Sequence, residues 1–101
     1  MSMKDIFTND QRLVILRTLA EDGYDANESI LQDVLEAYGH NVSRDLVRNH
    51  ALWLEEQGLV KIKRIDTGKG EFFVLEITQR GLDVAQGRVI VHGVKRPAPK
   101  I

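Results

Sequence analysis

The feature that most constrains the fold is a run of helix and turn signals in residues 42–81. Ser43 is a good N-cap for the amphipathic segment that follows it, and Gly58 is a suitable stop for that segment. Two segments with strand-like alternation then flank the turn at 66–70, which contains two glycines. Thr78 can cap a further helix. A helix, a hairpin and a helix with such short connections leave few compact arrangements.

The hairpin is expected to pair residues 60–65 with residues 71–77, because apolar side chains alternate along both segments. The helix before it is expected to run from Ser43 to Gln57, and the helix after it covers residues 79–86. The single tryptophan, Trp53, lies near the apolar stripe of the first of these helices, so we expect it in the core.

Two more helices are expected upstream. Thr8 and Gln11 have the spacing of a capping box, which predicts a helix that begins at Thr8 and ends at Gly23. Asn27 is a good N-cap for a second helix, which Gly39 ends. The short connection that follows is typical of two helices in a helix-turn-helix.

Together these elements predict an α+β fold, a winged helix-turn-helix with three helices, a two-stranded wing and a short fourth helix. The length of 101 residues suits a single domain. We expect a winged-helix domain at residues 1–87 and a basic C-terminal strand or tail at residues 88–101. The strand would lie at residues 88–94, because Pro97 and Pro99 disfavour regular structure after it.

Several classes of function are disfavoured by composition and spacing. The chain has no cysteine, which excludes a disulfide framework, a thiolate metal site and a cysteine nucleophile. His40, His50 and His92 do not have paired ligand spacing, so we expect no metal site. No phosphate loop, dinucleotide fingerprint or catalytic constellation is present, so we expect neither a cofactor nor an enzyme. The first ten residues lack the apolar region of a signal peptide, and no segment has membrane-spanning length, which suggests a cytoplasmic protein.

Charge is unevenly distributed along the chain. Residues 1–60 carry five basic and eleven acidic side chains, whereas residues 61–101 carry nine basic and four acidic ones, within a net charge of -1. Such an asymmetry indicates a localised anionic partner, or else a charge dipole that is only solvated.

Several motifs resemble known proteins. The segments WLEEQGLV at 53–60 and ITQRGLDVA at 77–85 resemble winged-helix bacterial regulators of the ArsR/MarR-like group. Small winged-helix proteins of Mu-like phages and prophages are more similar, in RLVILRTLAED (12–22), NESILQ (27–32), VSRDLVR (42–48) and GVKRPAP (93–99). This resemblance implies a DNA-binding transcriptional regulator. We expect it to act as a dimer, although the chain lacks the long terminal helix through which ArsR regulators typically dimerise.

The presented helix at 43–57 carries candidate DNA contacts. Arg44 and Arg48 lie in its first turns, where residues of a recognition helix reach base edges, and Arg can read guanine. Asn49 could read adenine. Ser43 and the free amides at the helix start could hold a phosphate. The alternative is an ordinary solvated helix start.

The wing at 60–77 is basic. We expect Lys63, Arg64 and Lys69 to contact the DNA backbone, with Lys69 at the tip of the hairpin. Lysines on an edge strand can instead serve to prevent pairing with other sheets. Residues 88–101 could bind DNA backbone or dock on a protein partner.

The second hypothesis is a winged-helix protein-protein interaction module that does not bind DNA. Glu55 and Glu56 would repel phosphates if the whole helix lay in the groove, and Leu52 projects from the same side. DNA binding therefore requires the helix to enter with its N-terminus first. If Arg44, Arg48 and Lys69 converge on one positive face, DNA binding is favoured. If Glu55, Glu56 and Leu52 interrupt that face, a protein partner is favoured.

Overall fold

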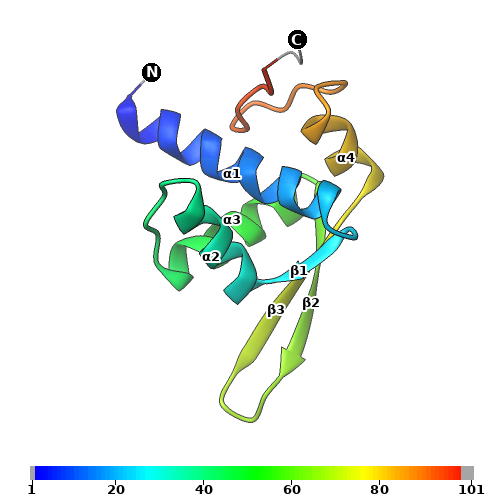
Figure 1. Cartoon of the computed structure of the whole chain (residues 1–101). Helices are drawn as coiled ribbons and strands as arrows, with labels where there is room; N and C mark the ends of the chain where they lie inside the picture. Colours follow the sequence, from blue (N-terminus) through cyan, green and yellow to red (C-terminus); the bar gives the residue numbers. More distant parts are fainter. Residues whose placement is uncertain (1, 99–101) are drawn as a thin grey trace.

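A computed structural model describes residues 2–98, which form four helices and a three-stranded antiparallel sheet in the order β1-β3-β2. The elements are α1 (Met3–Glu21), β1 (Asp25–Asn27), α2 (Glu28–Ala37), α3 (Arg44–Glu56), β2 (Val60–Asp66), β3 (Glu71–Ile77) and α4 (Gln79–Ala85). Figure 1 shows α1 lying across the other helices, with the β2–β3 hairpin extending away from them. This arrangement confirms the α+β winged helix-turn-helix, with a third strand added.

One apolar core joins α1, α2 and α3 to the inner face of the sheet. Its fully buried aliphatic side chains come from every helix of this group and from β3: Ile15, Leu16, Leu19, Leu31, Leu35, Val47, Ala51, Leu54 and Leu75. The apolar spacing on α1, α2 and α3 therefore has the core-facing role that helical periodicity predicts.

Three helix starts are confirmed by their caps. The side chains of Asn27, Ser43 and Thr78 accept the backbone N–H three residues later, at 2.9, 3.1 and 3.0 Å. Each cap satisfies a donor that the first turn of a helix leaves without an intrahelical partner. Gly39 and Gly58, which follow α2 and α3, have φ of 89° and 74°, as glycine stops do.

We expect Gly58→Ala to lower the free energy of unfolding by about 1 kcal/mol, because alanine is disfavoured at positive φ. An added Cβ would meet only the Arg80 side chain, at an ordinary 3.9 Å, so the cost is conformational rather than steric. Urea denaturation measures it. The neighbouring Gln57→Ala is the control, since Gln57 already has right-handed helical angles. Equal stability of the two variants would contradict this account of the α3–β2 junction.

The position predicted from the sequence for the start of α1 is wrong. The helix begins at Met3 rather than at Thr8, and Ser2 is its N-cap, with the Ser2 Oγ accepting the Asp5 N–H at 3.2 Å. A capping box is a local pattern, and no residue before Thr8 prevents the helix from starting earlier. The first turns of α1 consequently leave Ile6 and Phe7 half exposed.

Strand β1 was not predicted. It has only three residues and pairs with β3, with Asn27 opposite Val74. Tyr24, just before it, has a positive φ of 77°, and its carbonyl accepts the Ile77 N–H at 2.9 Å. Three residues are too few to show an alternation pattern, so β1 can be recognised only by its pairing with β3.

The strand expected at residues 88–94 is also wrong, because this segment forms turns up to residue 98 of the described chain. Gly93, with φ of 103°, interrupts the extended conformation. Its carbonyl accepts from Arg12 at 3.1 Å, while the Arg12 guanidinium lies 3.9 Å from the centre of the Trp53 ring. The Lys95 N–H donates to the Asn9 carbonyl at 3.0 Å. The C-terminal segment is therefore bonded along α1.

Candidate nucleic-acid interface

The connection between α2 and α3 brings the start of α3 to the surface. The Gln32 side-chain amide donates to the carbonyl of the buried Val42 at 3.1 Å, which holds the turn against α2. Ser43 is exposed and caps α3, while Val47 and Leu54 anchor the opposite side of that helix in the core. The first turn of α3 is thus accessible, as the helix-turn-helix prediction requires.

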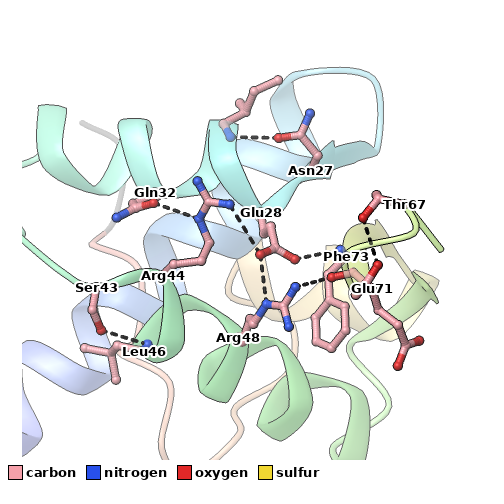
Figure 2. Close-up of polar contacts among 12 residues, drawn as sticks. Asn27, Glu28, Gln32, Ser43, Arg44, Leu46, Arg48, Thr67, Glu71 and Phe73 are labelled. Atoms are coloured by element: carbon pink, nitrogen blue, oxygen red, sulfur yellow. Dashed lines mark hydrogen bonds and ion pairs between the residues drawn. The ribbon is translucent and has the colours of Figure 1, made fainter. Parts of the chain in front are cut away.

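A buried carboxylate, which the sequence did not single out, organises this surface. Glu28 is the first residue of α2, and its side chain is 1% exposed. The carboxylate accepts from Arg48 Nε at 2.8 Å, from Arg44 Nη1 at 3.4 Å and from the Phe73 backbone N–H at 2.6 Å. Figure 2 shows both arginine side chains and the backbone nitrogen of Phe73 directed at Glu28. Three elements, α2, α3 and β3, therefore meet at one side chain.

The bond from Phe73 to Glu28 completes the sheet. Strand β1 ends at Asn27, opposite Val74, so the Phe73 N–H lies one residue beyond the last β1–β3 pair. Glu28 satisfies that donor with a carboxylate instead of a strand carbonyl. Burial opposes ionisation of Glu28, but hydrogen bonds from Arg48 and Phe73 outweigh it and lower the pKa of this carboxyl. Glu28 is therefore ionised at neutral pH and offsets part of the charge of the two arginines.

Both arginines make a second internal contact. Arg44 Nε donates to Gln32 Oε1 at 2.8 Å, and Arg48 Nη2 donates to the carbonyl of Glu71. The Arg48 guanidinium also lies 4.6 Å from the centre of the Phe73 ring. Their side chains are 41% and 32% exposed, so neither is fully free in solution nor fully buried. The structure brings these two candidate DNA contacts together, but within an internal network.

The wing is joined to α3 at a second point. Arg64 on β2 donates to Glu55 on α3, with Arg64 Nη2 3.0 Å from Glu55 Oε1, and lies 5.4 Å from the centre of the Phe73 ring. The hydrogen bond from Arg64 lowers the pKa of Glu55. Glu55, which the sequence analysis treated as a charge that repels phosphate, is therefore paired with a cation.

The remaining candidates lie on different faces. Lys63 and Arg64 are neighbours on β2, so their side chains project from opposite faces of the hairpin, and Arg64 occupies the face toward α3. Lys69 is exposed in the turn between β2 and β3, and Asn49 is exposed on α3. Leu52, one turn further along α3, is 38% exposed. Asn49 and Leu52 thus form part of the outer face of α3, beside the ion pairs.

His50 lies on the buried side of α3 in a polar chain behind the interface. His50 Nε2 lies 2.8 Å from Gln11 Oε1, and Arg12 Nε donates to His50 Nδ1 at 3.3 Å. Since the Gln11 oxygen only accepts and Arg12 only donates, these contacts fit a neutral imidazole protonated at Nε2. Gln11 Nε2 then contacts His40, whose Nε2 lies 2.7 Å from Asp10 Oδ2. The chain joins α1 to the helix-turn-helix.

Burial lowers the pKa of His50 to about 4, and the positive charge of Arg12 and the nearby His40 add to this effect. His50 is 2% exposed and has no route to a substrate. It therefore has a structural role.

Within residues 2–98, no group of three histidine, aspartate or glutamate side chains is arranged to hold a metal ion. None of the helices in this part of the chain is both long and apolar enough to cross a membrane.

Comparison with known proteins relates the chain to phage proteins. No protein-family model matches it. It is 56% identical over 98 residues to the uncharacterized protein gp26 of Escherichia phage Mu, a match that covers 97% of this chain and 98% of the relative. It is 60% identical over 82 residues to an uncharacterized protein of Haemophilus influenzae, which covers 81% of this chain and 78% of the relative.

The fold is similar to that of a transcriptional regulator homologue protein from Pyrococcus horikoshii OT3. The TM-score is 0.59 and the sequence identity is 29%, over 74% of this chain and 68% of that one. The phage relative covers almost the whole length of both sequences, and the architecture is that of a small winged-helix protein. The chain therefore belongs to the family of phage Mu gp26.

Proposed function

We propose that this protein is a DNA-binding transcriptional regulator of the phage or prophage type, with α3 and the β2–β3 wing as its contact surface. The observation that carries this proposal is the double connection between α3 and the wing. Arg48 and Arg64 hold these two elements as one surface, in a fold similar to that of a transcriptional regulator homologue protein. A cytoplasmic location and membership of the ArsR/MarR-like group remain predictions.

The contacts follow from the positions of the side chains. Ser43 and the first amides of α3 suit a phosphate, because a helix N-terminus attracts anions. Asn49 faces outward and suits a base edge. Lys69 at the wing tip and Lys63 on the outer face of the hairpin suit backbone phosphates. The exposed parts of Arg44 and Arg64 add positive charge next to these contacts.

The acidic residues of α3 determine how the helix could enter a groove. Pairing with Arg64 removes most of the repulsion expected from Glu55. Glu56, at the end of α3, stays exposed. Entry with the N-terminus first places Glu56 farthest from the phosphates, so this orientation remains the proposed one. A dimer would place two copies of α3 on neighbouring half-sites, and analytical ultracentrifugation tests that expectation.

Salt-dependent binding to duplex DNA is the experiment that tests the function. Affinity for random duplexes should fall with salt by about 0.9 log units per log unit for each phosphate contacted. We expect Lys69→Ala to weaken binding to all duplexes alike and to reduce this slope by about one contact per bound subunit.

Lys4→Ala is the matched control, because Lys4 is an exposed lysine in the first turn of α1. Figure 1 shows the start of α1 at the end of the molecule away from the wing. Lys4→Ala should leave both affinity and slope unchanged. Equal effects of the two variants would contradict a specific role for the wing tip.

A protein-protein interaction module is the second candidate. Leu52 favours it, since a 38% exposed leucine on the outer face of α3 would suit an apolar contact. This candidate replaces the first if the purified protein shows no salt-sensitive duplex binding at low ionic strength. Leu52 and residues 88–94 would then be the first surfaces to test.

A further inference from the structure

We propose that Arg48 is a positioning residue, which fixes the start of α3 against the wing through Glu28, and that Asn49 is the residue of α3 that reads a base. This inference rests on the proposed DNA-binding function. The sequence pattern makes both neighbours, Arg48 and Asn49, candidates for contacting bases. Here only Asn49 keeps that role.

Two of the five N–H donors of Arg48 are already engaged. Nε donates to Glu28, Nη2 donates to the Glu71 carbonyl, and one flat face of the guanidinium lies over the Phe73 ring. Reading a guanine requires two parallel N–H groups on one edge of a guanidinium. The edge formed by Nε and Nη2 is occupied on both atoms, so Arg48 could offer this edge to a base only by leaving its present partners. The other edge, formed by Nη1 and Nη2, shares Nη2 with the bond to Glu71, so the internal contacts also fix the direction in which it points.

Leaving these partners is unfavourable because Glu28 is buried. Its side chain is 1% exposed, and Arg48 provides the shorter of its two arginine contacts, at 2.8 Å against 3.4 Å from Arg44. Release of Arg48 would deprive a buried carboxylate of its strongest side-chain donor. A base edge would have to compensate for that loss before it contributed any affinity.

The same contacts determine the angle between α3 and the wing. Arg48 belongs to α3, Glu28 to α2, and Glu71 and Phe73 to β3, so one side chain spans three elements (Figure 2). The hairpin is otherwise long and mostly exposed beyond its base. Fixing it at this point lets α3 and Lys69 contact the same duplex without an ordering step at binding.

Asn49 has the properties that Arg48 lacks. It is exposed on α3, so its side-chain amide is open to solvent. An amide presents one donor and one acceptor, which match N7 and N6 of adenine. Its neighbours on the outer face, Asp45 and Leu52, are also exposed, so they leave Asn49 accessible to a ligand on that face.

The test compares base preferences. Duplexes that bind best are selected from a random pool with the wild-type protein, and the preference at each position is then measured for Asn49→Ala, Arg48→Ala, Arg48→Lys and Glu28→Gln. We expect Asn49→Ala to lose roughly tenfold discrimination at a single position. Arg48→Ala and Glu28→Gln should both weaken preference at all positions together, with the salt slope unchanged.

Glu28→Gln provides the sharpest discrimination. It keeps Arg48 but removes the negative charge and one of the two acceptor oxygens, so Arg48 and the Phe73 N–H can no longer both be satisfied. A base-reading Arg48 would then bind as well as before or better, whereas a positioning Arg48 would lose its function. Arg48→Lys keeps the charge but cannot bond Glu28 and Glu71 while it stacks on Phe73, so we expect only partial recovery. Relaxation at one position in Arg48→Ala, or wild-type binding by Arg48→Lys, would overturn the proposal.

A second measurement does not require DNA, which separates failure of this inference from failure of the proposed function. In the wild type, the short bond to Glu28 should shift the Phe73 amide proton downfield in NMR spectra. Backbone relaxation should show residues 66–70 moving with α3. In Arg48→Lys and Arg48→Ala the hairpin should gain independent motion while α3 stays folded. An unchanged hairpin in both variants would overturn the positioning role.

Discussion

Replacing Glu28 with alanine is expected to lower the free energy of unfolding by about 3 kcal/mol at pH 7. The loss has two parts. Arg44 and Arg48 lose a buried counter-ion, and the Phe73 N–H loses its only acceptor, at a position that β1 does not reach. Because both arginines are about one-third exposed and can turn toward water, the loss should lie near the lower limit for breaking a buried ion pair.

The same residue predicts a pH dependence. The pKa of Glu28 in the folded protein lies below its ordinary value of 4.5. The stabilisation from its ionised form is therefore complete above pH 4.5 and is lost as the pH falls through the lower, folded-state value. The difference in stability between wild type and Glu28→Ala should shrink in that acidic range.

Urea denaturation at several pH values measures both effects. Glu36→Ala is the control, because Glu36 is an exposed glutamate on the same helix, and we expect a change below about 0.5 kcal/mol. Equal stability of Glu28→Ala and Glu36→Ala at neutral pH would show that the ion pairs of Glu28 do not stabilise the fold.

The second large effect is expected from His50 in acid. Its pKa is about 4 in the folded protein against an ordinary value of 6.5, so the unfolded chain binds a proton more readily. Stability from this group is intact above pH 6.5 and falls progressively until about pH 4. A shift of this size corresponds to a loss of about 3 kcal/mol.

His50→Gln should remove most of this dependence. Glutamine does not titrate, so the stability of the variant should be flatter than that of the wild type between pH 6.5 and pH 4. The variant to compare is His92→Gln, because His92 is exposed and should leave the wild-type curve unchanged. Parallel curves for wild type and His50→Gln would mean that the buried imidazole accepts a proton without cost. Calorimetric melting at each pH provides an independent check.

The elements that could be predicted from sequence are those with local signals. Asn27, Ser43 and Thr78 cap helices in the structure because capping depends on a side chain and an amide three residues away. Strand β1 depends on β3, about fifty residues later, and has no local pattern. The early start of α1 was also missed, because Thr8 has the side chain of an N-cap residue although it lies inside the helix.

The positions of the candidate side chains could be predicted from the sequence, but their network of contacts could not. Arg44 and Arg48 lie in the first turns of α3, where the sequence places them, and their role as DNA contacts stays a prediction. Their shared partner, Glu28, is distant in sequence and follows a helix cap, where an acidic residue is common and needs no special explanation. Neither spacing nor charge indicates that Glu28 is buried. Only the packing of α2 against β3 does so.

The C-terminal segment has a consequence for how the protein is made. The bond from Lys95 to Asn9 and that from Arg12 to Gly93 join α1 to residues that lie 86 and 81 positions later in the sequence. During translation, α1 leaves the ribosome long before these partners do. It therefore acquires these contacts only after residues 93–95 have emerged. A chain stalled before residue 93 should accordingly have a first helix that is more sensitive to protease.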